Sequence, residues 1–410
     1  MNYLEKLLQG APVEWKTLGE LGNFYGGLTG KSKKDFEQGN AKYITYMNVF
    51  TNIATDLDSE NWVKVGDEER QNKIAYKDIL FTGSSETPNE CGMTSVVNQP
   101  IAEDIYLNSF CFGFRFDSEF IDIFDPDFLK YLFRGNLLRR EITRTANGVT
   151  RFNISKKKME KIKIPIPPLS VQKEIARILD ALTALTSELT SELTLRQKQY
   201  QYYRDKLLTF GDEVEWKTLG EVCDYVDYRG KTPKKVDRGV YLITAKNIKK
   251  GFIDYEVSKE YVSEEEYLEI MRRGLPKVGD VLITTEAPCG NVAQIDNEYI
   301  ALAQRVIKYR TKNSLILSNS FIKFFLLGNQ FQNDLMKIAT GGTVKGVKGS
   351  LLHKLKIPIP SIEEQKRIVE ILDKFDMLTN SISKGLPKEI ELRNKQYEYY
   401  REMLLGFERV

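Results

Sequence analysis

SVQKEIARILDALTALTSELTSELTLRQKQYQYYRDKLLTF, residues Ser170 to Phe210, is the stretch that decides the fold. It contains no Pro or Gly, and its apolar residues recur at steps of three and four, which predicts one long helix with a single apolar seam. The predicted seam residues are Ile175, Ile178, Leu182, Leu185, Leu189, Leu193, Tyr200, Tyr203 and Leu207. Such a helix would be about 60 Å long. Because a local core cannot bury so long a seam, we expect a second long helix beside it.

A segment with the same pattern closes the chain, from Ser361 to Phe407. Its RNKQYEYYREMLL nearly repeats the RQKQYQYYRDKLL of the first helix, and Ser361 with Glu364 forms a capping-box pattern at its start. The predicted seam residues are Ile368, Ile371, Phe375, Leu378, Ile382, Ile390, Tyr397, Tyr400 and Leu404. The alternative is two unrelated amphipathic core helices, but the shared tyrosine pattern argues against it.

Gly385-Leu386-Pro387 interrupts this second helical pattern. An interior proline costs a helix about 3 kcal/mol. We therefore predict a break and a restart near Pro387.

Shorter repeats extend the duplication to the whole chain. EWKTLGE occurs at Glu14–Glu20 and at Glu215–Glu221, and KIPIP begins at Lys163 and at Lys356, just before each long helix. Self-similarity at a fixed spacing indicates a repeat architecture. We predict a first domain over residues 1–163, a first spacer helix over 164–210, a second domain over 211–356 and a second spacer helix over 357–410.

Three similar helix ends suggest how these parts are connected. EKLL at Glu5, DKLL at Asp205 and EMLL at Glu402 resemble one another, so the chain starts where its second helix finishes. If the two chain ends meet in space, the long helices form an antiparallel two-helix coiled coil. One domain then lies at each of its opposite ends, with pseudo-twofold symmetry.

Each domain is predicted to be α+β, because short β-rich runs bounded by Gly, Asn and Pro precede a helical segment. The predicted strands are Lys42 to Val49, Asp78 to Phe81, Cys111 to Phe116, Tyr241 to Ile248, Asp280 to Thr284 and Ala303 to Lys308. The predicted helices are Phe128 to Arg144 and Ser320 to Lys337.

Composition restricts the class of protein. The 410 residues carry a net charge of only +3, so any surface that attracts nucleic acid must be local. The cysteines show no CxxC spacing, and His353, the only histidine, is expected to have a surface or packing role. With no signal peptide pattern and no long apolar run, we expect a soluble, cytoplasmic protein.

The sequence offers little for catalysis. Gly30-Lys31-Ser32 resembles the end of a phosphate-binding loop, but Tyr25 stands where that loop needs its first glycine. With one histidine, no nucleophile–histidine arrangement is apparent. We expect no catalytic site, no metal site and no cofactor on this chain.

Binding chemistry is better represented, in Gly-rich turns that carry hydroxyls and cations. Such turns suit close approach to a phosphate backbone. TANGVT from Thr145 has a counterpart in IATGGT from Ile338, and the recurrence favours a nucleic-acid surface over solvated charged loops. The candidates in the first domain are Lys31, Lys33, Lys34, Ser84, Ser85, Asn89, Arg144, Thr145, Asn147, Arg151, Lys156 and Lys157. Those in the second domain are Arg229, Lys231, Thr232, Lys246, Asn247, Gln304, Arg305, Thr343, Lys345 and Lys348.

Over essentially its whole length the chain resembles the specificity subunits of type I restriction–modification enzymes. EWKTLGE, KIPIPPLSVQKEIARILD and RQKQYQYYRDKLLTF carry the resemblance, in the family's order. The resemblance implies two target recognition domains that each read half of a split double-stranded DNA site, and a coiled coil that fixes their spacing. It also implies two methyltransferase subunits that bring S-adenosylmethionine and methylate adenines, and restriction subunits that use ATP and Mg²⁺. None of those catalytic centres would lie on this chain.

Two hypotheses follow for the function. The chain is either a non-catalytic DNA-recognition subunit or a coiled-coil adaptor that does not bind DNA and spaces two protein-binding domains. In the first case, the tandem LTSE units at Leu185 and Leu189 are predicted to set the gap between the half-sites. The alternative for this tract is helical filler.

Overall fold

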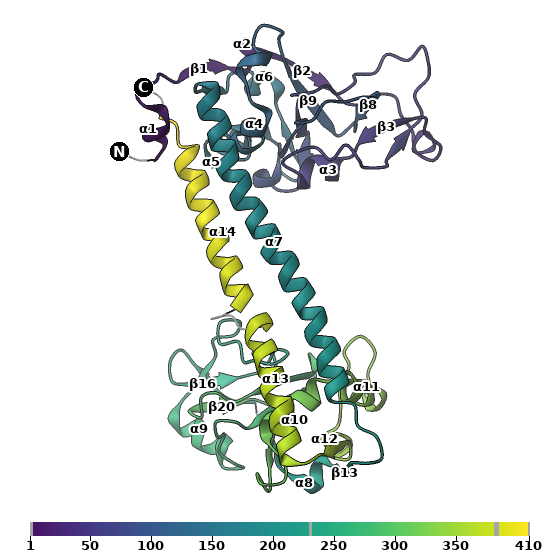
Figure 1. Cartoon of the computed structure of the whole chain (residues 1–410), viewed down its shortest axis with the longest axis vertical. Coiled ribbons are helices and arrows are strands. Elements are labelled where there is room, and N and C mark those ends of the chain that lie inside the picture. The colour runs from purple at the N-terminus through teal and green to yellow at the C-terminus, as the bar shows by residue number, and fades with distance from the viewer. Residues whose placement is uncertain (1–2, 229–231, 381–384, 409–410) are drawn as a thin grey trace. The chain divides into compact units, whose positions relative to one another are not determined.

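The computed structural model describes residues 3–228, 232–380 and 385–408, which form two compact units. The first unit comprises Met1–Ser187 and Glu391–Val410, and the second comprises Glu188–Ile390. Each unit is a mixed domain of sheets and helices (Figure 1). Each also contains part of the long helix α7 (Leu169–Leu207) and part of the C-terminal helices α13 (Ile362–Asn380) and α14 (Gly385–Leu404).

The first unit is built from short elements before α7. Its helices are α1 (Tyr3–Leu8), α2 (Leu18–Leu21), η1 (Lys33–Phe36), α3 (Tyr46–Thr51), η2 (Pro88–Glu90), η3 (Ile121–Ile123), α4 (Pro126–Leu132), α5 (Asn136–Arg144) and α6 (Lys156–Met159). Its strands are β1 (Glu14–Thr17), β2 (Gly22–Gly26), β3 (Ala41–Ile44), β4 (Trp62–Val63), β5 (Ile79–Thr82), β6 (Ser84–Ser85), β7 (Thr94–Val96), β8 (Ile105–Leu107), β9 (Cys111–Phe116), β10 (Ala146–Asn147), β11 (Phe152–Ile154) and β12 (Lys163–Ile166).

The second unit repeats this plan after α7. Its strands are β13 (Glu215–Thr218), β14 (Cys223–Asp227), β15 (Lys235–Val236), β16 (Val240–Ile243), β17 (Tyr261–Val262), β18 (Val281–Thr285), β19 (Cys289–Gln294), β20 (Ile300–Leu302), β21 (Val306–Thr311) and β22 (Lys356–Ile359). Its helices before α13 are α8 (Leu219–Val222), α9 (Glu264–Met271), α10 (Asn319–Leu327), α11 (Asn329–Ile338) and α12 (Gly349–Leu352).

The central sheet has the same topology in both units. Its strand order is β2-β9-β5-β7 in the first unit and β14-β21-β18-β19 in the second. A buried carboxylate anchors each sheet: Asp78 pairs with Arg115 at 2.6 Å, and Asp280 pairs with Arg310 at 2.5 Å. Burial beside Asp78 also raises the pKa of Tyr25, whose hydroxyl donates a 2.6 Å hydrogen bond to that carboxylate. Both units therefore share one framework.

The two copies of EWKTLGE and KIPIP form matching structures. Glu14 pairs with Ile166 across antiparallel strands β1 and β12, and Glu215 pairs with Ile359 across β13 and β22. The helix that follows each EWKT strand starts with a capping box, closed by Thr17 and Glu20 or by Thr218 and Glu221. Each KIPI strand thus leads from its domain into a long helix in the same way.

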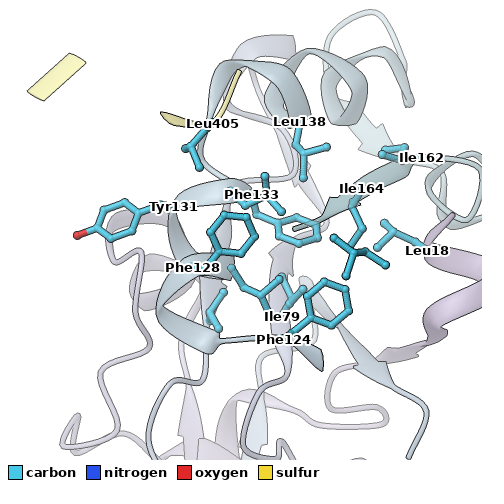
Figure 2. Packing of buried hydrophobic residues seen from close by; sticks show 14 of the residues in the cluster. Leu18, Ile79, Phe124, Phe128, Tyr131, Phe133, Leu138, Ile162, Ile164 and Leu405 are labelled. Atoms are coloured by element: carbon cyan, nitrogen blue, oxygen red, sulfur yellow. The ribbon is translucent and has the colours of Figure 1, made fainter. Parts of the chain in front are cut away.

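The core of the first unit joins the domain to the ends of the chain. Figure 2 shows Phe124, Phe128 and Phe133 packed among apolar side chains from the sheet, α5 and the chain's end. Leu4 of α1 belongs to this cluster together with Leu404 and Leu405. The two ends of the chain therefore meet in one core, as the similar helix ends predicted.

Each half of α7 has its own helical partner. In the first unit, Tyr397 of α14 lies beside Asp180 and Thr183 of α7. In the second, Tyr200 and Tyr203 of α7 stack on Phe375 of α13, with ring centroids 6.2 Å and 5.8 Å apart. Because α7 meets α14 in its earlier half and α13 in its later half, the pairing is antiparallel. The predicted α+β fold with paired spacer helices is confirmed.

The helices bury a broader face than the predicted seam. Ile175, Ile368 and Leu404 are buried as expected, but Leu179 and Leu372, outside the predicted seam, are fully buried against the domain cores. Tyr203 and Leu378 are more than a third exposed, and Ile382 lies outside the described residues. The first turns of each helix therefore pack on a domain as well as on a partner helix.

The second long helix is two helices, which confirms the predicted break near Pro387: α14 starts at Gly385, so Pro387 lies in its first turn, where a missing N–H costs little. Two other helix boundaries differ from the prediction. The segments predicted as single helices are α4 with α5 and α10 with α11, divided at Gly135 and Gly328. A Cβ on these glycines would lie 3.1 Å from Leu405 and 3.4 Å from Leu208. The glycines therefore leave room for a leucine from the end of a long helix.

Two predicted strands are also shorter than expected. The strand predicted over Lys42 to Val49 ends at Ile44, because Thr45 accepts a hydrogen bond from the backbone N–H of Asn48 and caps α3. The strand predicted over Tyr241 to Ile248 ends at Ile243, where Asn247 closes a turn. The strand predicted over Ala303 to Lys308 is displaced instead, since β21 starts at Val306 and continues to Thr311.

Candidate nucleic-acid interface

The Gly-rich turn of the first unit is a protruding hairpin. Strands β10 and β11 pair antiparallel, Asn147 with Asn153, and β11 continues onto β6 through Ser84 and Ser85. At the tip, Gly148 has φ +133°, and a Cβ there would lie 2.0 Å from the carbonyl oxygen of Arg151, so no larger residue fits. Beside it Val149 is 91% exposed. The hairpin therefore presents its tip to solvent.

The second unit builds the same hairpin from its own Gly-rich segment. Gly346 forms bridges with both Thr340 and Glu286, as Asn153 does with Asn147 and Ser84. Gly341 has φ +113°, and a Cβ on it would lie 2.2 Å from the carbonyl oxygen of Val344. The sequence match between TANGVT and IATGGT thus corresponds to one structural element.

Beside the hairpin of the first unit lies a pocket of about 790 Å³. The lining residues are Tyr46, Met47, Phe50, Ser84, Ser85, Glu86, Glu90, Phe110, Thr150 and Arg151. Arg151 lies over the ring of Phe110 at 5.8 Å, and its Nε donates a 3.2 Å hydrogen bond to Ser84 Oγ. The pocket therefore combines aromatic surface, carboxylates and a cation, which suits contact with base edges.

Three of the predicted contact residues, Ser84, Ser85 and Arg151, meet in this pocket. The sequence did not identify Met47 and Phe110, which are exposed apolar residues there. Apolar residues in β-rich runs are normally assigned to a core, so no local signal distinguished them.

The other cations of this hairpin region are exposed. They are Arg144, which pairs with Glu141 at 2.9 Å, Lys156 and Lys157. The ammonium of Lys156 lies 5.2 Å from the ring centroid of Phe112, and its partial burial there lowers its pKa. Asn147, also exposed, accepts a hydrogen bond from Lys158. We call Arg144, Lys156 and Lys157 the basic rim of this hairpin.

In the second unit, exposed cations follow the hairpin and the loop before it. Lys345 and Lys348 are exposed with Thr343 on the hairpin and its C-terminal flank, and Lys246 is exposed in the turn after β16. Arg305 is exposed and pairs with Glu286 at 3.0 Å, while Gln304 is half-buried. Thr232 is exposed, and Arg229 and Lys231 lie outside the described residues.

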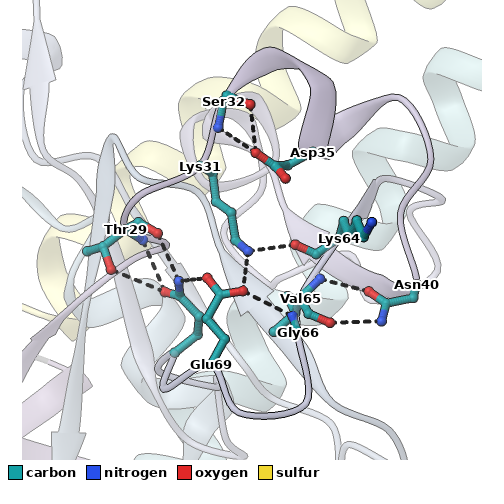
Figure 3. Close-up of polar contacts among 10 residues, drawn as sticks. Thr29, Lys31, Ser32, Asp35, Asn40, Lys64, Val65, Gly66 and Glu69 are labelled. Carbon is teal, nitrogen blue, oxygen red and sulfur yellow. Dashed lines mark hydrogen bonds and ion pairs between the residues drawn. The ribbon is translucent and has the colours of Figure 1, made fainter.

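Lys31 does not belong to this surface. Its side chain is 6% exposed, and its ammonium donates to Lys64 O at 2.6 Å and pairs with Glu69 at 2.5 Å, as Figure 3 shows. Because this charge is already enclosed and paired, we correct its assignment from DNA contact to loop closure. Its neighbours Lys33 and Lys34 on η1 are exposed.

Two further candidates are also structural. Thr145 is buried and donates its hydroxyl to Ile142 O, and Asn247 is 0% exposed and bonds to backbone on both sides of its turn. Neither side chain is free to meet a nucleic acid. Asn89 is exposed, and its carbonyl accepts a hydrogen bond from Arg139.

His353 has a packing role, as expected. Its ring stacks on Tyr225 at 3.5 Å between centroids, and its Nδ1 lies 2.7 Å from the hydroxyl of Tyr309. Within the described ranges, no group of His, Cys, Asp and Glu side chains is arranged to hold a metal ion. The helices described there include none long and apolar enough to span a bilayer.

Known proteins resemble this chain in both of its duplicated halves. The family model described as the type I restriction modification DNA specificity domain matches residues 12–196 and again 211–392. The specificity subunit of the type I restriction enzymes EcoR124I and EcoR124II of Escherichia coli is 34% identical over 436 residues, covering 99% of this chain and 97% of that protein. A putative type I specificity subunit of Haemophilus influenzae is 34% identical over 421 residues, covering 99% and 98%.

Solved structures share the fold. The S subunit of a type I restriction–modification system from M. genitalium aligns over 100% of both chains with a TM-score of 0.53 and 16% identity. A chain from a study of type I complex assembly and conformational transition aligns over 96% of this chain and 98% of its own, with a TM-score of 0.60 and 18% identity. On the family match and the full-length relatives, the chain belongs to the DNA specificity subunits of type I restriction–modification systems.

Proposed function

We propose that each unit reads one half of an asymmetric bipartite DNA site and that the paired helices set the gap between the halves. The observation that carries this proposal is the duplicated hairpin surface: one backbone framework occurs in both units with different side chains around it. Two readers with unlike side chains select unlike sequences. An adaptor that merely spaces protein-binding domains is not favoured by the family of the chain.

The basic residues around both hairpins support contact with DNA phosphates. The net charge of +3 is small, so the cations at Lys156, Lys157, Lys345 and Lys348 constitute a local attraction. Phosphate contacts position a protein on the duplex, and contacts with base edges provide selectivity. The rim would thus hold the duplex while residues such as Arg151 contact base edges.

The chemistry is proposed to come from partner subunits. Two methyltransferase subunits with S-adenosylmethionine would methylate an adenine in each half-site, and restriction subunits using ATP and Mg²⁺ would complete the complex. Tyr202 of α7 and Tyr399 of α14 occupy equivalent positions in the two QYxYY motifs and are 61% and 65% exposed. Such exposed aromatic surface suits partner docking. Since the substrate is chromosomal DNA, the complex would act in the cytoplasm.

Co-expression with the methyltransferase subunit, followed by genome-wide mapping of modified adenines, tests this function. We expect one asymmetric motif with two defined halves and a gap of fixed length. Binding of the purified complex to duplex DNA should weaken steeply with salt, because phosphate contacts release counterions. A complex that shows neither a bipartite motif nor salt-dependent binding would support the adaptor instead.

A further inference from the structure

Backbone hydrogen bonds establish which residues occupy equivalent places in the two reading surfaces. In the first unit, Gly83 N donates to the carbonyl oxygen of Phe110 at 2.7 Å, and in the second, Thr285 N donates to that of Arg305 at 2.9 Å. Gly83 and Thr285 both follow the last shared residues of the central strand, Thr82 and Thr284. Phe110 and Arg305 therefore hold the same backbone position.

The neighbouring position follows from the hairpin. The carbonyl of Gly83 accepts from Ile154 N at 3.0 Å, and that of Thr285 accepts from Val347 N at 2.9 Å. The next residues, Ser84 and Glu286, then bridge to the hairpin strand in the same register. Ser84 in the first unit is thus equivalent to Glu286 in the second.

The backbone pairing at this surface and one threonine are the same in both units, whereas the presented side chains differ. The hydroxyls of Thr82 and Thr284 each accept a 2.9 Å hydrogen bond from the next strand's backbone, at Met93 N and Asn291 N. At the same position of this frame, the first unit carries Phe110 and the second carries Arg305. A fixed frame with exchanged side chains is what a difference in base preference requires.

The backbone of Arg305 has a conformation that few non-glycine residues adopt. Its φ is +72°, in the left-handed region that non-glycine residues rarely adopt, and such backbone strain concentrates at functional sites. Its side chain is 52% exposed, and its Nε contacts Glu286 Oε2 at 3.0 Å. The ion pair ties the half-exposed guanidinium to a carboxylate on the same surface.

We infer that Arg305, oriented by Glu286, reads a guanine in the half-site recognised by the second unit. An oriented guanidinium donates two parallel hydrogen bonds to the O6 and N7 atoms of guanine, the commonest specific contact in the major groove. Phe110 makes no such pair in the first unit and offers an apolar contact instead. This inference rests on the proposed function, since it assigns a base to one of its two reading surfaces.

The test compares the adenine-methylation motifs of complexes that carry the wild-type chain, Arg305→Ala or Arg305→Gln. Arg305→Ala should retain the first half-site and the gap but lose its preference for guanine at one position of the second half-site, by tenfold or more. Arg305→Gln should shift that position towards adenine, because Gln pairs with the N6 and N7 atoms of adenine. Glu286→Gln should weaken the same guanine preference without moving it.

Control variants show whether a change in the motif comes from loss of base recognition or only from loss of a positive charge. Melting curves show whether a variant still folds. Arg272→Gln removes an arginine whose side chain is 80% exposed on the same unit and should leave the motif unchanged. Phe110→Ala should alter only the first half-site. Melting curves of all complexes identify a variant that fails to fold, and in that case the glutamine variant, which preserves much of the side chain, decides.

The inference is overturned if the two Arg305 variants methylate the wild-type motif with unchanged preference at every position. It is also overturned if the second half-site contains no guanine on either strand. Failure of the proposed function has a different signature, since the wild-type complex would then show no bipartite motif at all.

Discussion

Asn247 and Lys246 are neighbours in sequence with opposite roles. Asn247 Oδ1 accepts from Thr244 N at 3.0 Å, and its Nδ2 donates to the carbonyls of Asp254 and Ser258, both at 3.0 Å. In the first unit Asn48 likewise donates to Asp56 O at 2.8 Å. Lys246 points into solvent. The asparagine therefore shapes the turn that presents the lysine.

Asn247→Ala should destabilise the second unit by about 1–3 kcal/mol, since buried backbone groups lose their partners. Lys246→Ala should change stability by less than about 0.5 kcal/mol, while lowering DNA affinity and reducing the salt slope by about one. Thermal melting and salt-titrated DNA binding measure the two effects. An Asn247→Ala chain that melts like the wild type but binds DNA poorly would reverse this assignment.

The contribution of Glu69 to the stability of the fold should depend on pH in a direction that its pKa determines. The ammonium of Lys31, then the N–H of Gly66, lower the pKa of its carboxyl from 4.5 to about 2. Because the folded-state pKa is the lower one, the contribution to stability is complete above pH 4.5 and is lost as pH falls towards 2. Urea unfolding should show Glu69→Gln less stable than wild type at neutral pH. The difference should shrink across that acidic window, and a constant difference would contradict the account.

At the scale of elements, a buried glutamine attaches each helix to its domain. Gln172 Oε1 accepts from Asp125 N at 2.9 Å, and its Nε2 donates to Ile123 O and Pro167 O. Gln365 makes the same contacts to Ser318 N, Ile316 O and Pro360 O. Lys130 adds an ion pair to Asp180 at 2.8 Å. These contacts fix the start of each helix on the domain that it leaves.

Gln172→Leu should destabilise the first unit by about 1–3 kcal/mol, because three backbone groups lose their partner in a buried site. Hydrogen exchange of α4, whose N-cap residue Asp125 donates to Gln172, should speed up, while exchange in α10 should not change. Gln201→Leu, an exposed position of the same helix α7, is the matched control and should exchange like the wild type. Equal effects of the two variants would show that Gln172 has no special anchoring role.

For the whole molecule, the length of α7 is the quantity that matters to the proposed function. The tandem LTSE units lie at the division between the two units, within one uninterrupted helix. Four more residues lengthen a helix by about 6 Å and rotate its far end by about 40° beyond a full turn. One base pair of DNA spans about 3.4 Å and 34–36°. The two increments are of the same order.

Inserting one further TSEL unit should therefore keep both half-sites and widen the gap between them by one base pair. Mapping of methylated adenines measures the gap directly. Ser191→Ala, which changes the tract without changing its length, should leave the gap as it is. An insertion variant with the wild-type gap would mean that the tract is helical filler.

The duplication and the long helices were predictable from the sequence, and so was the meeting of the chain ends. All of these depend on the spacing of apolar residues and on short motifs at the ends of the helices. Both can be recognised even where the residues between them differ. The resemblance to specificity subunits rested on the same segments. The boundary near Pro387 was predictable too, since proline acts within one helical turn.

Only the tertiary structure decided which polar residues are free to bind. Lys31, Thr145 and Asn247 have the composition of a binding loop, yet long-range partners enclose them. Phe110 was not among the predicted binding residues and is exposed beside Arg151. The physical reason is that a helix can be recognised from residues three and four positions apart, whereas the burial of a side chain depends on segments that are distant in the chain.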